Sequence, residues 1–471
     1  MTSPTGDQPA IPPIRRNLAY AGIVLVILMT NMDGSIVNLA LPQLSRALRV
    51  SPQATVWVTT TYLLACACAV PATAALGDQL GRRRLFLTGV PMFTLASLGC
   101  AMAPTLPVLV AWRVVQGLGA AMLFAVLIPI MRMMFPPERM GAVFGVNAMA
   151  TAVGVCVGPS LSGLVLSHLT WPWLFLINLP VGVIAILTGF IGIPDHHGTR
   201  GSYDWPGALT AGGAIAAFII GVHELVDVNT LWIAGVLIAA ALVMVVSFVR
   251  CEKQAERPVL PLSMWNGVFS LSVTTAFWSF FGQGVAFVAL PFLFQSAYGA
   301  TPLRAALLFT PWPAAIVMVS PLIGRLSDRI RPGALAASGL AVYLVGLLAL
   351  ALLGDQPTHW EVLCFTGLAG LGFGIFQSPN NKEMQAAVPI ALASSGAAVL
   401  NLNRSVAQSA GSGMVSMALV LSGASAGSTL QEAHAAAGVL WVAVLGALFS
   451  LVLSAAKVRT ATRIDNMAVT Q

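Results

Sequence analysis

The chain has 471 residues, of which 57% are hydrophobic and only 8% are charged. Ordinary soluble domains carry about 25% charged residues, and no soluble fold could bury this much apolar surface. The composition therefore excludes a soluble protein and predicts a protein that crosses a membrane many times. The net charge of +7 does not indicate a nucleic-acid partner, because the basic residues fall in short clusters between apolar runs.

The chain begins with a polar, proline-rich segment, 1–17, which we expect to be a cytoplasmic tail. Fourteen apolar runs follow, and each is long enough, at about 20 residues, to cross a bilayer as a helix. The predicted spans are 18–41, 54–76, 85–103, 106–131, 141–166, 173–193, 206–223, 230–249, 267–297, 304–324, 334–353, 361–379, 394–421 and 436–456.

The distribution of basic residues sets the expected orientation. With both termini in the cytoplasm, 18 of the 23 Lys and Arg residues fall in cytoplasmic segments and three in outside loops. The positive-inside rule favours this arrangement and an even number of spans. The two remaining residues, Arg113 and Arg404, lie inside spans. We therefore expect a multi-pass protein of a bacterial inner (plasma) membrane.

A weak internal repeat divides the chain. ALGDQLGRRR (75–84) after span 2 resembles GRLSDRIRPG (324–333) after span 10, which places Asp78 and Asp328 250 residues apart. Repeated halves around a midplane site are a common plan of secondary transporters. The predicted fold is an all-α membrane protein with 14 transmembrane helices, in two pseudo-symmetric six-helix halves plus two inserted helices. Its predicted parts are an N-terminal six-helix bundle (18–193), a cytoplasmic loop (194–203), two inserted helices (204–250), a second cytoplasmic loop (251–266), a C-terminal six-helix bundle (267–456) and a cytoplasmic tail (457–471).

Several motifs follow one another along the spans. They are DGSIVNLALP (33–42), WVTTTYLLA (57–65), LGDQLGRRR (76–84), RVVQGLGAA (113–121), GVCVGPSLSG (154–163) and WLFLINLPVG (173–182). Together they resemble the major facilitator superfamily, and specifically its fourteen-span drug:proton antiporter family. The resemblance implies a proton-coupled efflux transporter that exports small hydrophobic or cationic compounds by alternating access.

The same resemblance implies gating roles for the loop between spans 2 and 3 and for its second copy. The residues concerned are Asp78, Gly81, Arg82, Arg83, Asp328 and Arg329. The first copy departs from the usual motif at Ala74, where Gly is common, and at Gln79, where a basic residue is common. From the residues alone, Asp78 could form a state-dependent ion pair at the end of span 2. For the neighbouring arginines, the positive-inside rule is an alternative explanation to a gating role.

Span 5 combines small residues with a proline. Gly154, Gly158 and Gly163 fall on nearly one helical face, which allows another helix to approach closely. Pro159 removes a backbone hydrogen bond and permits a bend. The pattern suits a helix that moves during transport, and ordinary helix packing is the alternative.

Asp33 interrupts the first span, where a carboxylate costs at least a few kcal/mol to insert. With a rise of about 1.5 Å per residue, Asp33 and Arg113 are expected at a similar depth. A buried charge needs a partner or water, so we expect these two side chains to interact. We hypothesise that Asp33 carries the coupled proton, because desolvation favours its neutral form and Arg113 or water favours its charged form. A cationic substrate could also pair with Asp33, and a static ion pair between two helices is the alternative.

We expect a substrate cavity between the halves, lined by polar and aromatic side chains. The predicted lining residues are Asn38, Tyr62, Gln116, Gln283, Phe287, Gln295 and Arg404. Aromatic rings suit an apolar or cationic drug. Arg404 could either bind an anionic group or complete a polar network.

Other classes of protein find little support. The sequence has no GxxxxGK[ST] motif, so we do not expect ATP to drive transport, and no catalytic motif indicates an enzyme. The adjacent His196 and His197 lack further ligands for a metal. We therefore expect no cofactor, with the proton gradient as the driving force. The expected partners are a small-molecule drug or metabolite, protons and the lipid bilayer, with no nucleic acid, and the protein is expected to be a monomer.

Three alternatives remain open at this stage. The first is a dedicated exporter of one metabolite or self-made antibiotic, which protection against a single compound would indicate. The second is a uniporter or symporter of the same superfamily. The third is a membrane enzyme or a sensor that does not transport.

Overall fold

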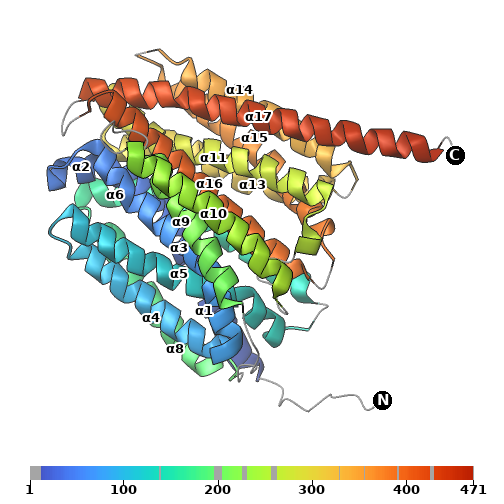
Figure 1. Ribbon diagram of the computed structural model, residues 1–471. Coiled ribbons are helices and arrows are strands. Elements are labelled where there is room, and N and C mark those ends of the chain that lie inside the picture. The colour runs from blue at the N-terminus through green and yellow to red at the C-terminus, as the bar shows by residue number, and fades with distance from the viewer. Residues whose placement is uncertain are drawn as a thin grey trace, which may run out of the picture.

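Every long element of the computed structural model is a helix (Figure 1). The described residues are 12–136, 139–195, 204–224, 231–255, 262–327, 329–354, 356–389, 392–424 and 429–469. No strand occurs among them. Within these residues, 13 helices are long and apolar enough to cross a membrane. The predicted all-α membrane fold is confirmed.

The N-terminal half begins with an interrupted helix. Helix α1 (Pro13–Ile36) is followed by a 3-10 turn, η1 (Asn38–Ala40), and by α2 (Leu41–Leu48). Pro42 lies in the first turn of α2, where its missing N–H would have no helical partner. The other helices of this half are α3 (Pro52–Leu80), α4 (Arg82–Ala101), α5 (Leu106–Met134), α6 (Met140–His168), α7 (Trp173–Leu176) and α8 (Asn178–Gly192).

The C-terminal half repeats this plan, and its first helix is again followed by an irregular turn. Its helices are α11 (Gly267–Phe292), the π-helical turn η5 (Leu293–Ala297), α12 (Pro302–Phe309), α13 (Pro311–Leu326), α14 (Pro332–Ala351), α15 (His359–Ala386), α16 (Ala393–Leu421) and α17 (Thr429–Val469). The short 3-10 turn η4 (Leu262–Met264) precedes them. In Figure 1 the yellow to red helices of this half lie above the blue helices of the first half.

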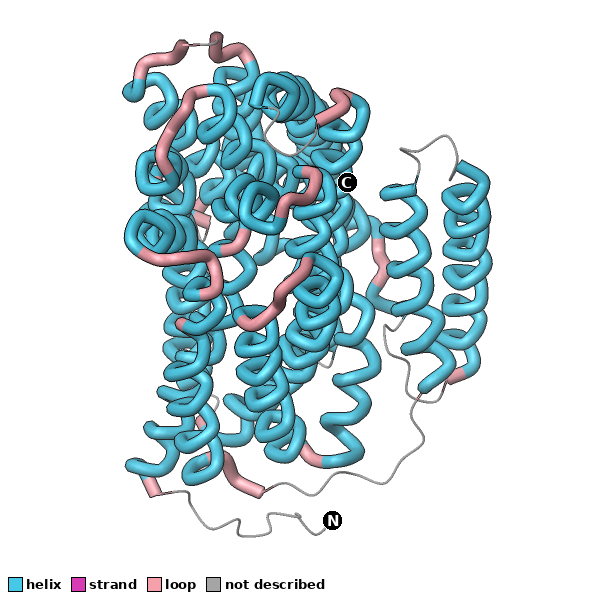
Figure 2. Tube along the Cα trace, turned by 90° about the vertical axis from the view of Figure 1, so that its left-hand side faces the viewer, coloured by secondary structure: helices cyan, strands magenta, loops and turns pink. Residues whose placement is uncertain are grey.

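Two further helices, α9 (Trp205–Glu224) and α10 (Leu231–Gln254), correspond to the predicted inserted pair. Helix α9 packs against α3 of the first half and α16 of the second, and α10 packs against α9. Figure 2 shows the pair at the edge of the bundle, on the right. Because α9 contacts both halves, it bridges them along one side of the molecule.

The predicted span 13 forms α16, although this helix is not among the 13 that meet the hydropathy limit. Its serine, asparagine and glutamine residues lower its mean hydropathy. The last helix, α17, continues past the predicted end of span 14 as far as Val469. The bounds predicted for the separate parts of the chain otherwise stay predictions.

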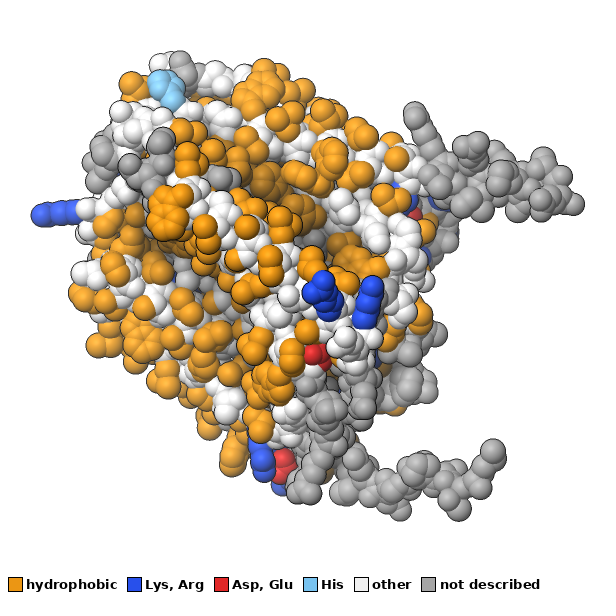
Figure 3. All heavy atoms as spheres, in the orientation of Figure 1, with side chains coloured by type: hydrophobic (Ala, Val, Ile, Leu, Met, Phe, Trp, Pro, Cys, Tyr) orange, Lys and Arg blue, Asp and Glu red, His pale blue; other side chains and the backbone are white. Residues whose placement is uncertain are grey.

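The surface of the bundle is largely apolar (Figure 3). Large hydrophobic side chains are exposed along α10, including Leu242 and Val243, at 65% each. A soluble protein would bury such residues, whereas lipid tails surround them favourably in a membrane. The chain is therefore a multi-span membrane protein.

The two halves contact each other near the helix ends that lie away from the termini. The Thr60 and Ser412 hydroxyl oxygens are 2.7 Å apart and join α3 to α16. Gln295 Nε2, in η5, donates to the backbone carbonyl of Leu39, in η1, at 2.9 Å. Both contacts are buried, so they help to close this end of the bundle.

Candidate functional site

Asp33 on α1 and Arg113 on α5 form a fully buried ion pair. Arg113 Nη1 lies 2.6 Å from Asp33 Oδ2, and both side chains are 0% exposed. Loss of either partner would leave a buried charge unpaired and would strongly destabilise the folded protein. The expected pairing of the two intramembrane charges is thus present in the structure, while its role in proton coupling stays a prediction.

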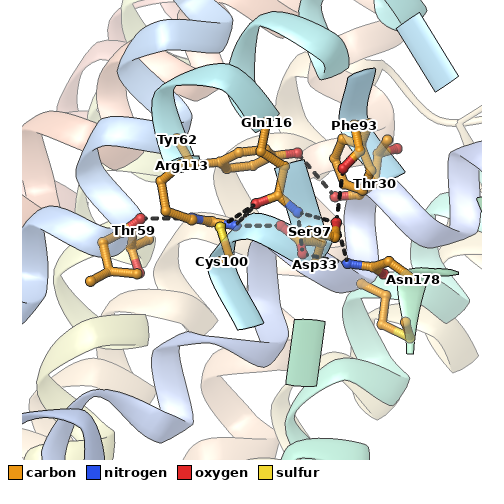
Figure 4. A network of polar contacts seen from close by, with 12 residues as sticks. Thr30, Asp33, Thr59, Tyr62, Phe93, Ser97, Cys100, Arg113, Gln116 and Asn178 are labelled. Atoms are coloured by element: carbon orange, nitrogen blue, oxygen red, sulfur yellow. Dashed lines mark hydrogen bonds and ion pairs between the residues drawn. The ribbon is translucent and has the colours of Figure 1, made fainter. Parts of the chain in front are cut away.

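The second carboxylate oxygen of Asp33 is held by two amides (Figure 4). Gln116 Nε2 donates to Oδ1 at 3.0 Å and Asn178 Nδ2 donates at 2.8 Å. Both amides also reach the Ser97 hydroxyl, at 2.8 Å and 3.3 Å respectively. Four helices, α1, α4, α5 and α8, therefore contribute side chains to one polar network.

The Arg113 guanidinium is held by more than the carboxylate. Its Nε donates to the Val58 carbonyl at 2.9 Å, and Nη1 also donates to Gln116 Oε1 at 2.6 Å. The Tyr62 ring lies against it, with the guanidinium carbon 4.3 Å from the ring centroid, which is a favourable cation–π geometry. Its Nη2 atom is buried without a hydrogen-bond partner in the described part of the chain, so the network has one unused donor.

A separate cavity of about 180 Å³ lies between the two halves. It is lined by residues of α1, α3, α5, α6, α11 and α16. Of the predicted lining residues, Asn38, Tyr62, Phe287 and Arg404 line this cavity. Asn38 is fixed there by Thr59, whose hydroxyl donates to its side-chain oxygen at 2.9 Å.

Three predicted lining residues are placed elsewhere, and the expectation for them is corrected. Gln116 lies in the Asp33 network, where it bonds the carboxylate. Gln283 is buried and accepts a hydrogen bond from Gln408 Nε2 at 2.9 Å. Gln295 faces the first half and bonds the Leu39 carbonyl. Each amide is used by a protein partner because a buried polar group without one would be costly.

Tyr62 separates the cavity from the charged network. Its side chain lines the cavity, while its ring also covers the Arg113 guanidinium. Its hydroxyl donates to the Thr30 carbonyl at 3.3 Å, which ties it to α1. Neither Asp33 nor Arg113 lines the cavity, so a substrate in it does not touch the carboxylate in this conformation.

Arg404 is the one charged residue among the described residues that line the cavity. No acidic side chain is among the described residues that line the cavity. Its guanidinium lies 5.8 Å from the Phe280 ring centroid. The cavity is therefore lined by apolar groups, amides and hydroxyls, with a single positive charge.

The glycines of α6 occur where other helices approach. A Cβ atom on Gly154 would lie 2.8 Å from the Leu28 carbonyl oxygen of α1. A Cβ on Gly158 would collide with Ser35, and one on Gly163 with Ala306 of α12. Gly163 thus permits close contact between the halves, and α6 continues through Pro159 without interruption. The proposed gating role of these four residues remains untested.

The loop between α3 and α4 turns at Gly81, whose φ of 96° suits glycine. Arg83 Nη2 donates to the Phe190 carbonyl at 2.8 Å, and its Nη1 lies 3.6 Å from Asp195 Oδ2, at the end of the same half. Such partly exposed ion pairs contribute little stability.

The remaining predicted gating residues give less information. Arg82 is half-buried and Arg329 is exposed. Asp78 lies in α3, but its side chain is not among those described, and Asp328 lies outside the described residues.

The structure contains a second ion pair, in which the lysine is buried and the carboxylate is partly exposed. Lys457, expected in the cytoplasmic tail, is only 5% exposed, and its ammonium group pairs with the Glu383 carboxylate of α15. It also lies 3.2 Å from the Ser272 hydroxyl and 3.5 Å from Asn380 Oδ1. The group joins α17 to α11 and α15 within the C-terminal half.

Two halves of membrane-length helices around a central cavity define a membrane transporter rather than an enzyme. The chain belongs to the Major Facilitator Superfamily, whose sequence model matches residues 23–412.

Characterised and uncharacterised transporters resemble the chain over most of its length. It is 33% identical to the uncharacterized transporter YebQ of Escherichia coli strain K12, over 88% of this chain and 92% of that protein. It is 29% identical to the riboflavin transporter RibZ of Clostridioides difficile strain 630, over 78% and 81% of the two chains. It is 30% identical to the multidrug resistance protein Stp of Mycobacterium tuberculosis strain CDC 1551 / Oshkosh, over 82% and 73%.

Solved structures share the fold. A bacterial homologue of the human lysosomal transporter Spinster, in an inward-facing and unoccupied conformation, superposes with a TM-score of 0.67. The match covers 95% of this chain and 97% of the other at 15% sequence identity. The likeness supports the superfamily fold and carries no information on substrate.

Proposed function

We propose that the protein is a proton-coupled efflux transporter that exports small, largely apolar compounds by alternating access. The observation that carries the proposal is the sealed Asp33–Arg113 network beside the cavity. An intramembrane carboxylate is costly, so its presence favours a functional role. The resemblance to a multidrug resistance protein supports export of foreign compounds.

The network offers a route from protonation to movement. A proton on Asp33 would remove the negative charge that holds Arg113, Gln116 and Asn178 together. The interrupted helix at η1 follows Asp33 closely, and its Leu39 carbonyl bonds Gln295 of the other half. A shift in α1 on protonation would therefore act on the contact that closes one end of the bundle.

The positive-inside rule places both termini in the cytoplasm. The closed end then faces outside, and the structure corresponds to an inward-facing conformation. In this conformation the cavity receives substrate from the cytoplasmic side. We place the protein in a bacterial plasma membrane, as a monomer with no cofactor.

The cavity supports the apolar part of the expected substrate range better than the cationic part. No described acidic residue lines it, and Asp33 is already neutralised by Arg113. A dedicated exporter of one compound is the second candidate, since one relative is named for riboflavin alone.

Efflux from intact cells tests the proposal. Cells that express the protein are loaded with a panel of apolar dyes, and the rate of dye loss is followed. A protonophore should abolish protein-dependent loss, whereas depletion of ATP with the gradient maintained should not. Loss that continues without a gradient would instead support a uniporter. Protection against one compound only would support the dedicated exporter.

A further inference from the structure

The two arginines inside the membrane differ in how their charges are balanced. Arg113 pairs with Asp33 and donates to two further protein oxygens. Arg404 has no ion pair and no hydrogen bond with the described part of the chain, and it lines the cavity. Its guanidinium carbon lies 5.8 Å from the centroid of the Phe280 ring. A guanidinium at this depth is expected to have a counter-charge, and here none is built in.

The described residues of the helices that line the cavity on both sides of Arg404 offer no free carboxylate. Helix α16 itself and α11 contain no Asp or Glu. Helix α3 contains only Asp78, close to its far end, and α1 contains only Asp33, which Arg113 already neutralises. Among the described residues that line the cavity, none therefore offers a negative charge to Arg404, and an anion that enters the cavity could do so.

The surroundings of Arg404 are suited to recognise a polar head group. Asn401, Arg404, Gln408 and Ser412 recur along α16 at helical spacing, and all four line the cavity. The guanidinium presents several N–H donors in a planar fork that matches carboxylate, sulfonate and phosphate groups. Phe287, Leu127 and Ile27 line the same cavity and offer apolar surface to the rest of a ligand.

We infer that Arg404 binds the anionic group of an amphipathic organic anion, and that the exported substrate belongs to this class. The inference rests on the proposed export function and narrows its substrate. Tyr62 and Arg404 both line the cavity, and the Tyr62 ring also covers the Arg113 guanidinium. A bound anion would therefore lie next to the side chain that covers the proton site.

Equilibrium binding to the purified full chain, in nanodiscs of zwitterionic lipid, tests the inference without any proton gradient. The two probes are fluorescein, an anion at neutral pH, and rhodamine 123, a cation on the same three-ring scaffold. The wild-type protein should bind fluorescein at least tenfold more tightly, because a charged hydrogen-bonded pair forms only with the anion. Equal affinity, tighter binding of rhodamine 123, or no binding of fluorescein would overturn the inference.

Variants assign the effect to Arg404. Arg404→Gln should weaken fluorescein binding by about tenfold to a hundredfold and leave rhodamine 123 binding unchanged or improved. Arg404→Lys should retain part of the preference, because it keeps the charge and loses the planar fork. Arg250→Gln, on the exposed face of α10, is the matched control and should bind as the wild type does. Unchanged fluorescein binding in a folded Arg404→Gln variant would contradict the inference.

The outcomes separate this inference from the proposed function. Anion-selective binding without proton movement during transport would leave the Arg404 site intact and refute proton coupling. Proton-coupled efflux together with equal binding of anionic and cationic probes would support the proposed function and refute the Arg404 anion site.

Discussion

The centroid of the Tyr62 ring lies 4.3 Å from the Arg113 guanidinium carbon, and the ring forms part of the wall between the cavity and the buried network. One aromatic side chain thus touches both the substrate space and the charged network. Because Asp33 is fully buried behind it, a proton can leave toward the cavity only if this wall moves or water passes it.

Removal of the wall should uncouple proton movement from transport. In Tyr62→Ala, water would reach Asp33 from the cavity, and we expect protons to leak through proteoliposomes without substrate. Tyr62→Phe keeps the ring and loses only the weak bond to Thr30, at 3.3 Å, so it should remain tight. Proton flux measured with an enclosed pH dye checks both variants. A Tyr62→Ala protein as tight as the wild type would show that the wall lies elsewhere.

The amide of Asn178 should stabilise the folded protein through Asp33. Asn178→Ala leaves the carboxylate one donor short, which is expected to cost about 1–3 kcal/mol. Thermal unfolding in detergent measures this loss. Asn401→Ala is the control, because its side chain is exposed in the cavity and is expected to change stability little. Equal melting temperatures for the two variants would contradict the assigned role of Asn178.

A disulfide at the closed end should lock the transporter. The Thr60 and Ser412 oxygens are 2.7 Å apart, so Thr60→Cys with Ser412→Cys, in a chain without its native cysteines, should form a bond readily on mild oxidation. We expect oxidation to stop transport and a reductant to restore it. Either cysteine alone should have no such effect. Full transport by the oxidised double variant would show that the two helices need not separate.

The Lys457–Glu383 pair should contribute to stability rather than to coupling. Loss of one partner, as in Lys457→Met, leaves the partly buried Glu383 carboxylate unpaired and is expected to cost about 1–3 kcal/mol. The double variant Lys457→Met with Glu383→Leu should recover much of that loss. Unfolding of the two singles and the double, as a thermodynamic cycle, gives the coupling. Additive losses would indicate that the two groups do not interact.

If the substrate is an anion, its exchange for a proton should depend on membrane potential. Export of an anion removes negative charge from the interior, and entry of a proton adds positive charge to it. A negative interior therefore favours both movements, by about 2.3 kcal/mol per elementary charge for each 100 mV. Export of fluorescein from preloaded vesicles should therefore accelerate when valinomycin and a potassium gradient make the interior negative. A rate independent of the potential would argue against exchange of this charge.

The pairing of Asp33 with Arg113 could be predicted from sequence because both charges lie inside spans at matching depth. Their other partners could not. Ser97 and Asn178 are short polar residues on otherwise apolar helices, and neither hydropathy nor periodicity distinguishes them from ordinary packing residues. Asn178 does fall inside the motif at the entry to span 6, which is the only signal that could have pointed to it.

The prediction for the cavity was less complete for a similar reason. Depth along a helix is readable from sequence, but the direction that a glutamine faces depends on which helix packs beside it. Gln283 and Gln295 lie at suitable depths and are used by protein partners instead. The sequence predicts a tail position for Lys457 because charge normally marks the end of a span, whereas in the structure Glu383 pairs with this lysine.

The most direct test is substrate-driven proton movement in everted membrane vesicles, followed with a pH-sensitive dye. Anionic, neutral and cationic compounds are added to vesicles that contain the wild type, Asp33→Asn or Asp33→Glu, after normal insertion of each has been verified. The account predicts proton release on substrate addition in the wild type, none in Asp33→Asn, and partial release in Asp33→Glu, which keeps a titratable group. Equal responses of the wild type and Asp33→Asn would contradict it, because the carboxylate paired with Arg113 would then be structural.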